Sequence, residues 1–567
     1  MKKQSIKNLA FVAVAGTIVS SCTLLKDLDY TVTPNPLEMH GDSVSVTVDV
    51  VFPPKSVNRK ASAEITPMLG ETALKPVTIM GEKATANGTV INFKEGGKIT
   101  YTDVIAYKPA FENADLNIGA IVSKKGKVKD EVGPYKIADA TIITPFMVNK
   151  DFKVILAEDQ FERVTPESTF AQLNYAKGKS NVTTKEMKDD DITAYQDWLA
   201  MAHENPKVAI TSINIVGFAS PEGEEDKNGT LSTDRAGTAA ESYKKIAMKA
   251  ENEGAAEMTC KTSGSGSDYP GFKKALLASD DRIAEDEKQL IIRVLEMNKN
   301  NPDKIEEELR NMRKTFTQLD REIFPLLRRA EITTNYDLTG FSDEEMKTNS
   351  VSNPDTLDLE ELLFCAGLYD DLGEKLRVYK IAESRYPEDY RPANNVGAVL
   401  YMMNKVSEAK AKFEKAAGIK DNPITSNNLG AVAGVGGDRS KSWGLLNQAG
   451  SAPEVSYNKG ILNIQDGDYS DALSNLGSDA SFNKALATML DGTPGSVAGI
   501  IGGSDDADSG QGHYLKAVAA ARQDNMSEVV NNLKNAIAKD GKFKAMAAKD
   551  REFLKYFENA GFTAIVK

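Results

Sequence analysis

The feature that most constrains this chain is a spaced pattern of small and bulky residues in its C-terminal third. A small residue is followed by a second small residue 12 positions later, a bulky one 16 positions later and alanine 19 positions later. Small residues let two helices approach closely, and the bulky residue fills the groove to the next helix pair. One pair cannot bury its own apolar face, so at least three must stack. The best matches are Gly397, Ala409, Phe413 and Ala416; Gly430, Ser442, Leu446 and Ala449; and Gly460, Ala472 and Leu476.

This spacing resembles the tetratricopeptide (TPR) repeat, and it predicts an all-α, TPR-like solenoid over residues 346–567. Residues 483–501 look like a shortened, degenerate copy. Such arrays commonly bind peptides or proteins on their concave surface, so we expect a protein partner in the groove. The alternative is an array that packs only on itself and braces the domain before it. Further copies include Leu363, Tyr379 and Ala382, and Ala517, Val529, Leu533 and Ala536.

The N-terminus has the pattern of an export signal. Lys2, Lys3 and Lys7 precede an apolar run over residues 9–19, which is too short to span a bilayer. The run ends in Val-Ser-Ser-Cys22, which resembles the bacterial lipobox. The resemblance implies removal of residues 1–21 and lipidation of Cys22, with several acyl chains anchoring the chain to the outer membrane. We favour its periplasmic face over the cell surface; a plain signal peptide with a chance cysteine is the alternative.

Residues 22–150 are predicted to form a β-sandwich. The run 43–52 alternates with period two until Pro53-Pro54 stops it, because proline cannot donate to a strand ladder. Short strands separated by turn signals are typical of a small sandwich. We expect this domain to act as a spacer or docking module. The other expected strands are 88–93, 98–105, 116–122 and 138–146.

Residues 151–345 alternate between strand and helix signals, with a charged helical insertion near 275–320. The segment Gly217-Phe-Ala-Ser-Pro-Glu-Gly223, followed by Asn228, Leu231-Ser232 and Arg235-Ala236, resembles the OmpA-like domain. Its Ala-Ser-Pro-Glu-Gly form is similar to OmpA-like proteins of the Bacteroidetes group. The resemblance implies an α/β fold in which 170–175, 210–216 and 327–336 are strands.

The resemblance also implies a peptidoglycan site. OmpA-like domains hold the ammonium of diaminopimelate with an aspartate and its carboxylate with an arginine. Arg235 stands at the arginine position, and Asn228 belongs to the same motif. Ser220 replaces the aspartate, and a neutral hydroxyl cannot supply the charge-assisted bond, worth about 1.5–3 kcal/mol. Glu222 or Asp226 could substitute for it, and reuse of the fold for protein contacts is the alternative.

Composition excludes several other functions. Lys and Arg number 69 and Asp and Glu 82, so the chain carries a net charge of −13 and should repel nucleic acid. The chain has only three His and three Cys, so we do not expect a zinc site, and it has no recognisable catalytic or phosphate-binding motif. We therefore expect no enzyme activity, no metal and no cofactor. Pairing of Cys260 with Cys365 stays open.

Together these patterns predict a multidomain α+β lipoprotein with a β-sandwich, an OmpA-like domain and a TPR-like array. The predicted function is a non-catalytic outer-membrane scaffold that joins a protein complex through its array and contacts peptidoglycan through its middle domain. A dedicated peptidoglycan-binding tether is the alternative, in which Arg235 is essential.

Overall fold

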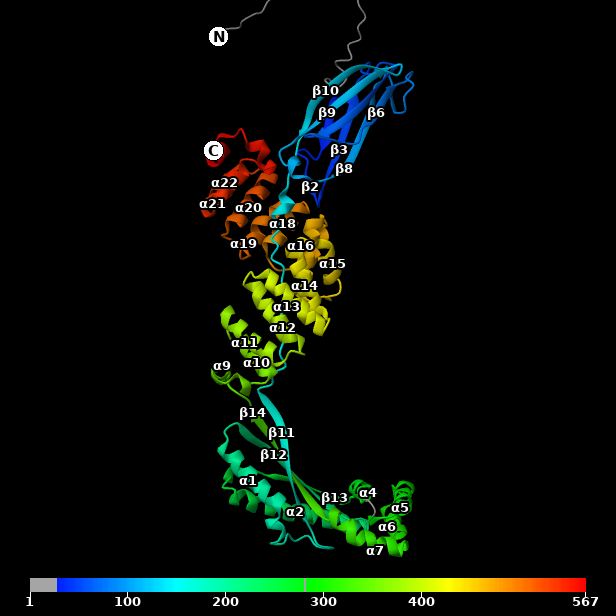
Figure 1. Cartoon of the computed structure of the whole chain (residues 1–567), viewed down its shortest axis with the longest axis vertical. Coiled ribbons are helices and arrows are strands. Elements are labelled where there is room, and N and C mark those ends of the chain that lie inside the picture. Colours follow the sequence, from blue (N-terminus) through cyan, green and yellow to red (C-terminus); the bar gives the residue numbers. More distant parts are fainter. Residues whose placement is uncertain (1–27, 280–281) are drawn as a thin grey trace, which may run out of the picture. The chain divides into compact units, whose positions relative to one another are not determined.

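The computed structural model describes residues 28–279 and 282–567 (Figure 1). The chain divides into two compact units, one of residues 1–158 with 370–567 and one of residues 159–369. The first unit therefore contains the N-terminal β region, residues 151–158 and most of the helical array. The domain boundaries expected at 150/151 and 345/346 stay predictions.

The N-terminal β region consists of two sheets around one core. In β3 (Ser43–Phe52) the even-numbered side chains are buried, as its period-two alternation predicts. One sheet has the order β1-β3-β2, with β8 also paired to β3; the other has the order β10-β9-β4-β6-β7, with β5 paired to β4. The remaining strands are β1 (Asp29–Thr33), β2 (Met39–His40), β4 (Ala61–Leu69), β5 (Thr72–Ala73), β6 (Val77–Gly81), β7 (Thr89–Ile91), β8 (Gly97–Ala106), β9 (Asp115–Lys124) and β10 (Lys127–Asp139).

One expected strand in this region is wrong. Residues 138–146 were expected to be extended, but β10 ends at Asp139 and a 3-10 helix spans Thr144–Met147. Pro145 occupies one of the first two positions of that helix, where its missing N–H costs nothing.

The helical array consists of stacked helix pairs, and its packing confirms the predicted spacing. A Cβ atom added to Gly397 would lie 2.8 Å from the Phe413 ring, and one added to Gly460 would lie 2.7 Å from Leu476. The small residues are therefore the points of closest approach between paired helices. The helices are α11 (Leu372–Arg385), α12 (Tyr390–Met402), α13 (Val406–Ile419), α14 (Pro423–Val435), α15 (Arg439–Leu446), α16 (Pro453–Asp466), α17 (Tyr469–Leu476), α18 (Phe482–Leu490), α19 (Val497–Gly502), α20 (Gly510–Arg522), α21 (Met526–Lys539), α22 (Lys542–Ala547) and α23 (Ala560–Val566).

The second unit is built on a four-stranded sheet of order β11-β14-β12-β13. Its β12–β13 pair is parallel, and its other two pairs are antiparallel. Helices α1 and α2 share one core with the sheet. The elements are β11 (Val164–Asn174), α1 (Asp190–Glu204), β12 (Val208–Ala219), α2 (Glu225–Lys249), α3 (Glu253–Glu257), β13 (Cys260–Ser267) and β14 (Arg329–Thr339).

A helical segment with its own hydrophobic core separates β13 from β14 in the chain. It comprises α4 (Tyr269–Leu277), α5 (Glu285–Met297), α6 (Pro302–Asn311), α7 (Arg313–Glu322) and α8 (Phe324–Leu327). Helices α9 (Asp343–Ser352) and α10 (Leu359–Gly367) complete the unit. Within residues 28–279 and 282–567, we find no helix with the length and apolar character needed to cross a bilayer.

Candidate functional site: an asparagine ladder in the helical array

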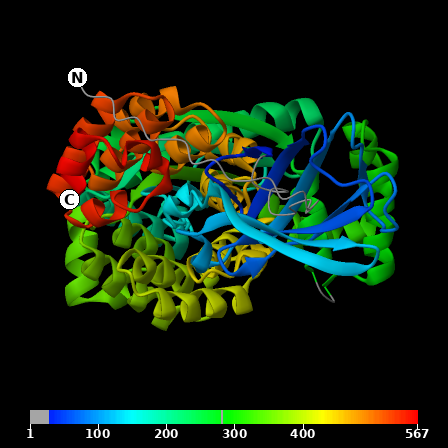
Figure 2. The same ribbon diagram turned by 90° about the horizontal axis from the view of Figure 1, so that it is seen from above.

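An extended segment of the chain lies along the helical array. Residues 149–157, here called the strap, have neither helical nor strand structure. In Figure 1 they follow the β region in cyan and run beside helices α18, α16, α14 and α12. Seen from above in Figure 2, this segment lies inside the curve of the orange and yellow helices. The groove in which we expected a partner therefore holds part of the same chain.

Four asparagines hold the strap by its backbone, and we call them the asparagine ladder. Each side chain accepts a hydrogen bond from a strap N–H and donates one to the carbonyl of the same residue. The paired distances are 2.8 and 2.9 Å for Asn483 with Asn149, 2.6 and 2.8 Å for Asn458 with Lys153, 2.7 and 2.8 Å for Asn428 with Ile155, and 2.7 and 2.9 Å for Asn395 with Ala157.

The ladder repeats because the array repeats. Its members lie on the first helices of four successive pairs, α12, α14, α16 and α18, and all are buried. The strap runs in the opposite direction, so its N-terminal end meets α18 and its C-terminal end meets α12. A strand repeats its geometry every second residue, which matches the bonds at Lys153, Ile155 and Ala157.

A second row of asparagines completes the network. Asn394 donates to the carbonyl of Ile155 at 3.0 Å, and Asn427 donates to that of Lys153 at 3.1 Å. Further bonds of 2.8 Å from Asn428 to Asn394 and of 3.0 Å from Asn458 to Asn427 link neighbouring repeats. Buried amides without partners cost free energy, so this network requires an extended backbone in the groove.

The strap also has apolar anchors. Phe152 is 2% exposed, and a Cβ added to Gly434 would lie 2.4 Å from its ring. Because Gly434 on α14 has no side chain, the Phe152 ring can pack directly against the helix backbone. Tyr401 donates to the carbonyl of Phe152 at 2.9 Å, and Ala157 is also buried. By contrast, the side chain of Lys153 is 48% exposed.

None of the ladder residues was predicted, although the sequence carries a signal for them. Asn395, Asn428 and Asn458 each stand two positions before the small residue that marks a repeat, and Asn483 stands two before Ala485. Asparagine is an ordinary surface residue on helices, so its recurrence in the buried register of a repeat is the informative observation.

An ionic cluster around the buried carboxylate of Glu552 joins the β region to the end of the array. Arg522 on α20 donates to Glu552 at 2.6 Å and also pairs with Glu38, which lies beside β2. Thr144 donates to the Glu552 carboxylate as well. Burial raises the pKa of Glu552 despite the opposing effect of Arg522. Breaking such a buried pair leaves an uncompensated charge, so the cluster holds these two parts together.

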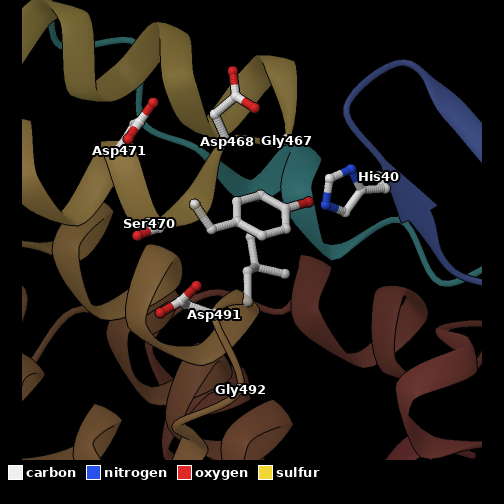
Figure 3. Close-up of a pocket in the computed structure, with 9 residues that line it drawn as sticks. His40, Gly467, Asp468, Ser470, Asp471, Asp491 and Gly492 are labelled. Atoms are coloured by element: carbon white, nitrogen blue, oxygen red, sulfur yellow. The ribbon is translucent and has the colours of Figure 1, made fainter.

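A polar hollow of about 600 Å³ lies where the turn between β2 and β3 meets the array (Figure 3). The His40 ring packs edge-on against Tyr469, with centroids 5.0 Å apart. A Cβ added to Gly467 would lie 2.6 Å from His40 Nδ1, and burial raises the pKa of Tyr469 to about 12. Through these contacts of His40, the turn between β2 and β3 packs against the array at the hollow. In the described part of the chain, no three His, Cys, Asp or Glu side chains are placed to hold a metal.

The structure brings together the three residues expected at a peptidoglycan site, but their polar groups bind within the protein. Arg235 is 1% exposed and donates to the carbonyls of Phe218 at 2.7 Å and Lys179 at 3.0 Å. Burial lowers the pKa of its guanidinium to about 10. Ser220 donates to Glu222 at 2.8 Å, and Asn228 donates to the Ser220 carbonyl at 3.0 Å.

The acidic candidate beside them is also engaged. Arg328 donates to both carboxylate oxygens of Glu222, at 2.9 and 2.8 Å, and to Asp320 at 2.7 Å. Lys177 lies 3.1 Å from Glu222. Arg328 and Lys177 therefore neutralise Glu222, the carboxylate that could take the place of the missing aspartate. Asp226, the other candidate, is exposed.

The remaining sequence predictions concern the three cysteines. Cys22 lies outside the residues that the structure describes, so its lipidation stays a prediction. Cys260 and Cys365 do not form a disulfide with each other, and Cys365 is buried.

No protein-family model matches this chain, and no curated protein matches it. Solved structures similar to it include YrrB, a TPR protein with an unusual peptide-binding site, at 20% identity and a TM-score of 0.21, over 35% of this chain and 94% of that one. The Cut9-Hcn1 hetero-tetramer of the APC/C is similar at 11% identity and 0.29, over 67% and 70%. Yeast Tom70 is similar at 14% and 0.24, over 64% and 70%. The helical array is TPR-like in its pairing and register.

Proposed function

We propose that this chain is a non-catalytic scaffold of the bacterial outer membrane, anchored by lipid on Cys22 and using its TPR-like array for protein contacts. The observation that carries the scaffold proposal is the asparagine ladder, because it binds an extended backbone through paired hydrogen bonds. Such a surface recognises polypeptide and positions no group for chemistry. The lipobox resemblance supports the anchor.

We propose that the middle unit is OmpA-like. Its motif supports this, as do β11, β12 and β14, which cover most of the ranges that the resemblance implies to be strands. The wall-tether alternative has less support. Arg235 is turned to backbone carbonyls, and Glu222 is paired with Arg328, so neither presents a free charge to diaminopimelate. We infer that protein contacts, with the membrane anchor, are the main role.

The test of this proposal is fractionation combined with cross-linking. In its native host, the chain should be found in the outer-membrane fraction with an acylated N-terminus. Cys22→Ser should block processing and release or misplace the protein. Cross-linking in intact cells should capture defined protein partners. A Cys22→Ser protein that still fractionates as a mature, acylated species would refute the anchor.

A further inference from the structure

The groove of the array is filled in this chain, yet most of its bonds do not depend on the identity of the strap. The eight ladder bonds end on backbone N–H and carbonyl groups, which every residue except proline presents alike. Any extended segment with N–H groups in this register can make them. The identity of the strap residues matters at Phe152, which packs on Gly434, and at the buried Ala157, five residues later. It also matters at Asp151, whose carboxylate accepts hydrogen bonds from Tyr457 and Asn483.

The strap can also leave its groove without unfolding a helix or strand. The preceding strand β10 ends at Asp139, and the following strand β11 begins at Val164. The strap itself forms neither kind of element. Because the asparagines are buried, however, an empty groove would leave many amides without partners. Replacing the strap by another extended segment therefore costs much less free energy than leaving the groove empty.

We propose that the strap is an internal competitor and that the groove accepts, in its place, an extended segment of a partner protein. This inference rests on the proposed function, since it assumes that the array makes protein contacts. The partner segment needs an aromatic residue at the Phe152 position and a small residue five positions later. It cannot have proline at the four positions that donate to the ladder.

Tethering determines how the strap competes. A covalently attached segment has an effective concentration on the order of millimolar, so a free peptide binds poorly while the strap is intact. Weakening the strap without altering the groove should therefore reveal binding in trans. Lys153→Pro does this, because it removes the N–H that donates to Asn458 at 2.6 Å. It also removes the half-exposed Lys153 side chain, whose ammonium lies 5.0 Å from the centre of the Tyr457 ring. Phe152→Ala does it by removing the aromatic anchor.

The experiment uses the full mature chain in detergent and a fluorescein-labelled peptide with the sequence of residues 147–158. Fluorescence anisotropy should show at least about tenfold tighter binding to Lys153→Pro than to the unaltered protein. The same peptide with alanine in place of its phenylalanine should bind about 30-fold more weakly, because it lacks the buried ring. Gly434→Val, added to Lys153→Pro, should abolish binding because the new side chain occupies the space of the ring.

Three results would overturn the proposal. The first is a peptide that binds Lys153→Pro no better than the unaltered protein, although circular dichroism shows both to be folded. The second is equal binding of the phenylalanine and alanine peptides. The third is a dimer of the unaltered chain, seen by light scattering and lost in Phe152→Ala, because the occupant would then be the strap of a second copy. The Lys153→Pro variant decides the matter if Phe152→Ala does not fold. Since anchoring by Cys22 is not involved, failure here leaves the fractionation result untouched.

Discussion

Replacing Asn428 by alanine should release the middle of the strap. Its side chain is fully buried and takes part in four hydrogen bonds, two with Ile155 at 2.7 and 2.8 Å, one with Asn394 at 2.8 Å and one with Asn427 at 3.1 Å. The Ile155 carbonyl keeps its bond from Asn394, but the Ile155 N–H loses its acceptor. An unsatisfied buried donor costs about 1–3 kcal/mol, and each lost bond costs about 0.5–1.5 kcal/mol. We expect a local destabilisation of about 2–4 kcal/mol.

Hydrogen exchange at the amide of Ile155 is the direct assay, because the N–H that exchanges is the one that Asn428 binds. A loss of about 2 kcal/mol should speed its exchange about 30-fold. Asn535→Ala is the matched control, since Asn535 is exposed on α21. If Asn428→Ala and Asn535→Ala exchange at the same rate at Ile155, the ladder does not hold the strap and our reasoning is wrong.

Three further predictions concern the repeats, acid stability and the wall. Gly460→Val should overpack α16 against Leu476 and cost about 1–3 kcal/mol in denaturant unfolding; an unchanged midpoint would contradict the register. Burial raises the pKa of Glu383, but Lys412 and Lys415, at 2.7 and 2.8 Å, lower it more, so its net value lies below 4.5. Its contribution to stability is therefore present above about pH 4.5 and lost as the pH falls through the depressed value. In Glu383→Gln, the thermal stability of the array should depend less on pH below about 4.5. Arg235→Ala should destabilise the second unit, while sedimentation with sacculi stays at background for it, for Ser220→Asp and for the unaltered chain; Arg235-dependent sedimentation would restore the wall-binding hypothesis.

The parts of the fold that could be predicted are those encoded over short distances. Gly397 and Phe413 lie within one helix pair, so the spacing that brings them together is visible in the sequence. The alternation in β3 is similarly local. The strap was missed because its partners lie 238 to 334 residues away and because an extended segment has no periodicity of its own.

The motif around Arg235 shows a different limit of prediction from sequence. A motif identifies which residues come together, and Arg235, Ser220 and Asn228 do lie in one region. It does not show whether their polar groups face a ligand or the protein. Glu222 and Arg328 are 106 residues apart, and nothing local indicates that they pair.

The connection between strap and array also sets an order of events in folding. The ladder residues follow the strap by hundreds of positions, so the strap cannot bind along its full length until α18, which carries Asn483, has been synthesised and has stacked. Helix pairs form from local contacts and fold rapidly, whereas closing a loop of this length is slow. The seating of Phe152 is therefore a late step, and until then its ring and the neighbouring apolar side chains are exposed to whatever other polypeptide is near. Until the strap binds, the groove is therefore also accessible to extended segments of other proteins.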